Sequence, residues 1–219
     1  MFMEDSERAA ALALDGGVEA GLHVNFTTPF SATQCPVQLV SHQQALAEYL
    51  LRHRFAQVVY HPGLVRSFEY VVAAQVDEFR RLYGSEPNRF DGHHHMHLCT
   101  NVLVQKLLPT GAVVRRSFSF QAGEKSAANR LYRWMIDGVL ARRYRIVELF
   151  VSLAPLQPAL RLQRILSLAR GLVVEIETHP VDPSEYRFLV SGQISSGARG
   201  LRIVPPSAVP WSALARVRA

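Results

Sequence analysis

The sequence predicts an α/β fold with a mainly parallel sheet. Short apolar runs rich in Val and Ile alternate with longer segments of helical periodicity along the 219 residues. No stretch has the composition of a linker, an internal repeat or a low-complexity segment. We therefore expect one domain over residues 1–191. A tail of little order is expected at 192–219, where Pro205, Pro206 and Pro210 lie.

In the first half of the chain, the first expected strand covers residues 20–26, where Leu22 and Val24 alternate with His23. The clearest helix runs from Ser67, a candidate N-cap, to Gly84. Its expected buried face consists of Val72, Val76, Phe79 and Tyr83. The other expected elements are a helix at 41–53, a strand or loop at 55–65 and a strand at 88–92.

The second half continues the alternation of helices and strands. A helix at 126–143 carries an apolar stripe made of Leu131, Trp134, Met135 and Val139. The expected strands cover residues 112–116, 146–152 and 172–178. The other expected helices cover residues 101–108 and 158–170, with a short one that begins near Ser184.

Charge and composition exclude several classes of function. The net charge is +6, but Arg residues are scattered on helical segments and form no basic run, so we expect no nucleic-acid partner. Two cysteines, Cys35 and Cys99, are too few for a disulfide framework. The acidic N-terminus does not resemble a signal peptide, and no apolar run reaches the ~18 residues of a membrane span. These features predict a cytoplasmic protein without a membrane partner.

The strongest candidate site is the run Asp-Gly-His-His-His-Met-His at residues 91–97. In an extended chain, Asp91, His93, His95 and His97 would project to one face. Isolated histidines are usually structural, but a cluster beside a carboxylate is typical of a metal site. We therefore interpret this segment as a candidate metal site.

Two further histidines end predicted strands. His23 lies in the first, and His179 follows a strand that carries Glu175 and Glu177 on one face. Functional groups gather at the carboxyl ends of parallel strands, so these histidines can converge on one site. Each is otherwise a structural histidine, which is the interpretation we keep for His42, His53 and His61.

Three segments together resemble one known family. They are Gly21-Leu22-His23-Val24-Asn25-Phe26, the stretch from Gly84 through the histidine run to Leu98, and Glu175-Ile176-Glu177-Thr178-His179-Pro180. Their order and spacing resemble the YdjC-like carbohydrate deacetylases over residues 1 to about 189. The resemblance implies a distorted (β/α) barrel that removes acetyl groups from N-acetylated sugars or oligosaccharides with a divalent metal ion, magnesium or zinc.

Carried over by position, the resemblance assigns roles to several residues. His23 and His93 would bind the metal, and Asp91 would act beside it as a catalytic or supporting carboxylate. His179 would protonate the leaving amine. A supporting or substrate-binding role would fall to His95, Glu175 and Arg115.

This sequence departs from the family pattern at its start. Family members open with a strand ending in Asp-Asp-Phe-Gly, which supplies a metal-binding aspartate and is not found here. We therefore expect a barrel that lacks its first βα unit, from a misplaced start or in a degraded relative, with an open edge that favours a homodimer. The alternatives are a non-catalytic sugar- or metal-binding relative, or a metal-dependent phosphoesterase that uses the face of His93 and His95.

Overall fold

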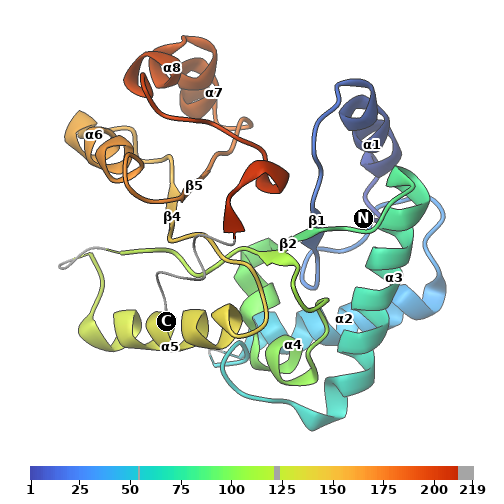
Figure 1. Ribbon diagram of the computed structural model, residues 1–219. Coiled ribbons are helices and arrows are strands. Elements are labelled where there is room, and N and C mark those ends of the chain that lie inside the picture. The colour runs from blue at the N-terminus through green and yellow to red at the C-terminus, as the bar shows by residue number, and fades with distance from the viewer. Residues whose placement is uncertain (54, 121–123, 212–219) are drawn as a thin grey trace. The chain divides into compact units, whose positions relative to one another are not determined.

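The computed structural model describes residues 1–53, 55–120 and 124–211 (Figure 1). The chain divides into two compact units. The first consists of Met1–Arg115 and Arg142–Tyr144, and the second of Arg116–Ala141 and the chain from Arg145 onward. The expected division at residue 191 stays a prediction.

A three-stranded parallel sheet forms the centre of the first unit. Its order is β1 (Leu22–Val24), β2 (Arg89–Gly92) and β3 (Val113–Val114). Each strand lies within a predicted strand but is shorter. Leu22 and Val24 are buried while His23 between them is exposed, which confirms the predicted alternation.

Helices α2 (Val37–Arg52) and α3 (Val65–Tyr83) pack against each other, and α3 also packs against β1 (Figure 1). The core between them is apolar and contains fully buried Phe26 and Phe68, whose ring centroids are 5.2 Å apart. Burying such large side chains stabilises the unit, since each contributes about 1.5–3 kcal/mol. The unit also contains α1 (Ser6–Asp15), the 3-10 helices η1 (Pro62–Leu64) and η2 (His93–Leu98), and α4 (Thr100–Gln105).

Two details of this unit differ from the sequence predictions. Helix α1 was not predicted. Ser67 does not cap α3, which begins two residues earlier; the buried Ser67 hydroxyl is hydrogen-bonded to His42 Nδ1 at 3.0 Å. For residues 55–65 the prediction left strand and loop open, and the described residues form a loop of turns with η1. The predicted end of α3 is confirmed, because Gly84 adopts a left-handed φ of 65° and its N–H bonds to Arg80 O.

The second unit contains a two-stranded parallel sheet of β4 (Leu149–Ser152) and β5 (Val174–Glu177). Its helices are α5 (Ala127–Ala141), α6 (Ala159–Leu168), α7 (Pro183–Val190), α8 (Gln193–Gly197) and η3 (Pro206–Ala208). Helices α8 and η3 lie within residues 192–211, the described part of the predicted tail, and the tail as a separate segment stays a prediction. Residues 212–219 lie outside the described part of the chain.

The predicted apolar stripe of α5 is exposed rather than buried: Trp134 is 71% exposed, and Leu131, Met135 and Val139 are also exposed. The opposite face holds the helix in place, through buried Leu140 and Asp137. Asp137 accepts hydrogen bonds from the Arg116 guanidinium and from the backbone N and hydroxyl of Ser117. A buried ion pair therefore decides which face of α5 is covered, and helical periodicity does not report such a pair.

The mixed α/β architecture with parallel sheets confirms the predicted fold class. The described strands form two separate sheets, and the distorted barrel stays a prediction. Within the described ranges, no helix combines the length and the apolar character that crossing a bilayer requires.

Candidate functional site

The register of β1 and β2 places His23 directly beside Asp91. The His23 Nδ1 atom lies 2.8 Å from Asp91 Oδ1. An ionised carboxylate only accepts hydrogen bonds, so His23 Nδ1 must carry the proton and donate. In the neutral imidazole, this leaves the lone pair on Nε2, and the side chain is 52% exposed.

Asp91 is buried and is surrounded by donors. Arg115 Nη2 lies 2.8 Å and Arg89 Nη1 lies 3.2 Å from its Oδ2 atom. Burial alone would raise the pKa of this carboxyl. The hydrogen bond from His23 and the positive charges of Arg115 and Arg89 outweigh burial and hold the pKa well below its usual range. Asp91 therefore stays ionised. It is better suited to orienting His23 than to accepting a proton as a base.

Arg89 was not singled out by the sequence analysis as a residue of this site. It lies two positions before Asp91 on the same strand, so the alternation of side chains already places both on one face. That spacing was a usable signal. Arg115 was named as a candidate for substrate contact, but the structure directs its guanidinium to Asp91.

The histidine segment does not continue the strand, so the predicted common face of Asp91, His93, His95 and His97 is wrong. The chain turns into η2 after Gly92, and His94 and His95 adopt left-handed φ values of 53° and 57°. Such values cost roughly 1–3 kcal/mol per residue and cluster at functional sites. The phosphoesterase alternative loses its basis, because it required His93 and His95 on one extended face.

His97 closes this turn from inside the protein. It is fully buried, and its Nε2 donates to Arg115 O at 2.9 Å. Burial lowers the pKa of His97 to about 3, so its imidazole is neutral. Its Nδ1 packs against Gly92, whose missing Cβ would lie 3.1 Å away. His97 thus holds Arg115 and the turn in place.

His93 faces the exposed side of the site. Its ring centroid lies 5.8 Å from that of His23 and 4.0 Å from that of His94. Partial burial, followed by the neighbouring His94 and His23, lowers the pKa of His93. A neutral imidazole is the form that binds metals.

Two side chains that no sequence pattern singles out, Thr27 and Gln57, contact His94 and His95 and hold their left-handed backbone in place. Thr27 Oγ1 lies 3.2 Å from His94 Nδ1, and Gln57 Nε2 donates to His95 O at 3.0 Å. The turn that carries Thr27 is fixed in its place by Asn25 Oδ1, which accepts from the backbone N–H groups of Thr27 and Thr28. These contacts are long-range or local to a turn, and periodicity does not reveal either kind.

His23 and His93 are spaced as two ligands of one divalent ion would be. Two imidazoles bound to one zinc ion, with Zn–N distances of about 2.0–2.1 Å, have ring centroids roughly 5–6 Å apart. The separation of 5.8 Å between His23 and His93 fits this arrangement. Across residues 1–53, 55–120 and 124–211, however, no group of three or more His, Cys, Asp or Glu side chains is placed to hold a metal. The described residues thus fit two ligands of an ion and leave its other positions to water, substrate or another donor.

The remaining candidates, His179 and Glu175, belong to the second unit. Glu175 lies in β5 opposite Phe150 of β4. His179 follows β5, and its backbone N donates to Glu185 Oε2 at 2.7 Å. Its imidazole is 55% exposed, with Nδ1 3.8 Å from Glu185 Oε1.

Gly92→Ala tests how tightly the turn is built. A Cβ at position 92 would lie 2.9 Å from His97 N and 3.0 Å from His97 Cβ, so backbone must shift. We expect the substitution to lower the free energy of unfolding by about 1–3 kcal/mol. The matched control is Gly138→Ala in α5, where an added Cβ meets nothing within 4 Å and should be neutral or stabilising. Urea unfolding followed by circular dichroism measures both; equal effects would contradict the close approach of His97.

Comparison with known proteins identifies the family. A family model described as "YdjC-like protein" matches residues 1–199, which covers 199 of the 219 residues and all three segments on which the resemblance rests. A search of curated proteins finds no match. YdjC-like proteins are related to carbohydrate deacetylases. The chain belongs to the YdjC-like protein family.

Proposed function

We propose that this protein removes N-acetyl groups from a carbohydrate with the help of a divalent metal ion. The observation that supports the proposal best is the pair His23–Asp91 beside His93. A carboxylate that fixes the proton on one imidazole nitrogen leaves the other nitrogen ready for a metal, and this arrangement recurs at metal sites.

In this proposal, His23 and His93 hold the ion through neutral imidazoles. Asp91 orients His23, while Arg89 and Arg115 keep Asp91 ionised. When bound, the ion supplies a Lewis acid for the acetyl carbonyl and lowers the pKa of a water molecule. Asp91 is not assigned the role of general base, because its carboxylate already accepts from three side chains.

Further roles are proposed for other residues of the chain. His179 would donate a proton to the leaving amine, and the Glu185 carboxylate, with Oε1 3.8 Å from His179 Nδ1, could orient its imidazole. Glu175 and His95 are proposed as supporting or substrate-binding residues. Arg115 is proposed to act through Asp91.

The test is acetate release from N-acetylated chitooligosaccharides by the full chain, with Mg²⁺ or Zn²⁺ added. His23→Ala and His93→Ala should each lower the rate by about 100-fold or more and weaken Zn²⁺ binding measured by calorimetry. His42→Gln is the matched control, because His42 bonds to Ser67 and takes no part in the site. Equal losses in all three variants would contradict the assigned pair. If His23 and His93 bind zinc but no acetate is released, the protein is a non-catalytic, metal-binding member of the family and the proposed activity is wrong.

A further inference from the structure

Helix α5 carries an exposed apolar stripe that takes no part in the proposed reaction. The spacing of its members along the helix places them on one face, and they are Leu131, Trp134, Met135 and Val139. A Cβ added at Gly138, which lies among them, would meet nothing within 4 Å, so no described atom covers this part of the face. Contiguous apolar patches on a protein surface are typical of a surface that meets a partner.

The packing of α5 is inverted compared with an ordinary surface helix, which turns its apolar face to the core. Here the covered face includes buried Asp137, whose carboxylate lies 2.5 Å from the Arg116 guanidinium. Separating this pair would leave an uncompensated charge away from water, which is costly. The pair therefore holds α5 in an orientation that turns Trp134 and its apolar neighbours outward.

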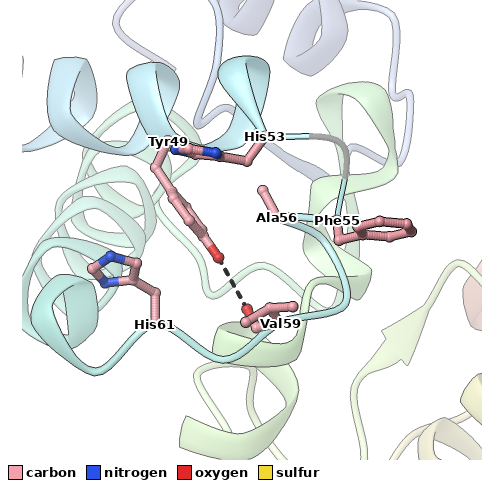
Figure 2. A pocket seen from close by; sticks show the side chains of 6 residues that line it. All are labelled: Tyr49, His53, Phe55, Ala56, Val59 and His61. Atoms are coloured by element: carbon pink, nitrogen blue, oxygen red, sulfur yellow. Dashed lines mark hydrogen bonds between the residues drawn. The ribbon is translucent and has the colours of Figure 1, made fainter.

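The first unit offers a different kind of apolar surface, a cavity of about 440 Å³ (Figure 2). It is lined by Tyr49, His53, Phe55, Ala56, Val59 and His61. The Tyr49 hydroxyl donates to Val59 O at 3.2 Å within this wall. A concave site of this size suits a small molecule. The outer face of a helix encloses no ligand, so the α5 stripe suits an extended surface instead.

The positive charge of the chain is concentrated in the second unit. This unit holds 13 of the 24 Lys and Arg residues and 7 of the 18 Asp and Glu residues, which gives a net charge of +6. The first unit holds 11 of each kind and is neutral. The whole excess of positive charge therefore belongs to the unit that carries the stripe, and the complementary partner is a negatively charged surface.

The charged side chains along the stripe are also positive. Arg130 is exposed and lies one turn before Trp134, and Lys125 is exposed just before the helix. Helix α5 contains one acidic residue, Asp137, which lies on the covered face. The stripe of a second copy would therefore offer Arg130 no counter-charge, whereas the phosphate groups of anionic lipids would.

We propose that α5 docks the protein on a membrane surface that contains anionic lipids. The stripe lies among the headgroups and the upper part of the acyl chains, with Trp134 at the interface that tryptophan favours. Arg130 and the net charge of the second unit attract the lipid phosphates. The sequence prediction of no membrane partner rested on the lack of a spanning run and of a signal peptide, and docking of this kind requires neither. The proposal does not depend on the proposed function.

Leu131→Ala tests the stripe, with Leu12→Ala in α1 as the matched control. The two leucines are 56% and 63% exposed, so neither substitution should unfold the protein, but Leu12 belongs to the neutral first unit. Cosedimentation would compare binding of the full chain to vesicles of phosphatidylcholine alone and to vesicles that also contain phosphatidylglycerol. Wild type and Leu12→Ala should bind the anionic vesicles roughly tenfold or more tightly, and salt should weaken this binding. Leu131→Ala should weaken it roughly three- to tenfold.

Two further variants test the aromatic ring and the charge. Trp211→Phe leaves Trp134 as the one tryptophan of the chain. The emission of Trp134 should then shift to shorter wavelength on anionic vesicles, because the ring leaves water. Arg130→Gln should lower the affinity for anionic vesicles roughly fivefold.

Equal binding by Leu131→Ala and Leu12→Ala, or an emission of Trp134 that anionic vesicles do not change, would overturn the proposal. Equal binding to neutral and anionic vesicles would overturn the role of charge in it. Concentration-dependent dimers that Leu131→Ala abolishes, in a protein that ignores vesicles, would assign the stripe to a second copy of the chain instead.

Discussion

Asp91→Asn is expected to lower the free energy of unfolding of the first unit by about 3–5 kcal/mol. The amide keeps the size of the side chain but replaces one carboxylate oxygen with a donor. Arg89 and Arg115 both direct N–H donors at Oδ2. If the amide nitrogen of asparagine took the place of Oδ2, its own N–H groups would face these donors and form no hydrogen bond with them. The guanidinium groups of Arg89 and Arg115, whose side chains are 18% and 12% exposed, then lose the negative charge of Asp91.

Asp77→Asn is the matched control for this prediction. Asp77 is also paired with an arginine, Arg80, but its side chain is 70% exposed, so its loss should cost less than about 1 kcal/mol. Both tryptophans, Trp134 and Trp211, lie in the second unit, so far-UV circular dichroism is a better probe of the first unit than fluorescence. A cost for Asp91→Asn as small as that of Asp77→Asn would show that the carboxylate does not hold the site together.

The same buried carboxylate explains why the sequence predicted the site only in part. Period-two alternation placed His23 on the exposed face of β1, and the rule that side chains gather at strand ends predicted that it could meet the histidine segment. The actual partner of His23 depends on register, which relates residues 68 positions apart. No local pattern encodes that register.

The orientation of the histidines could not be predicted because it depends on backbone geometry that most residues avoid. An extended chain is the reasonable expectation after a strand, but buried His97 packs against Gly92 and turns the chain away. His94 and His95 then adopt left-handed φ values, held by contacts from Thr27 and Gln57. Strained positions of this kind are where local rules are expected to fail.

Acid is expected to destabilise the first unit through His97. Burial lowers the pKa of His97 from about 6.5 to about 3, so the unfolded chain takes up a proton below pH 6.5 that the folded chain refuses. Stability is therefore complete above pH 6.5 and falls by about 1.4 kcal/mol per pH unit as the pH decreases toward 3. The expected loss between pH 7 and pH 4 is about 3 kcal/mol. The lowered pKa of His93 acts in the same direction, whereas Asp91 contributes a further loss only below its usual range near pH 4.

His97→Gln separates this effect from the other titrating groups. Glutamine keeps an amide donor for the carbonyl oxygen of Arg115 but does not titrate, so the variant should lose less stability than wild type between pH 7 and pH 4. Urea midpoints from circular dichroism at pH 7, 5.5 and 4 measure the two slopes. Because the comparison is between slopes, it holds even where the variant is less stable at pH 7. Equal slopes would mean that His97 is already protonated in the folded protein at pH 4, so that burial does not keep its imidazole neutral.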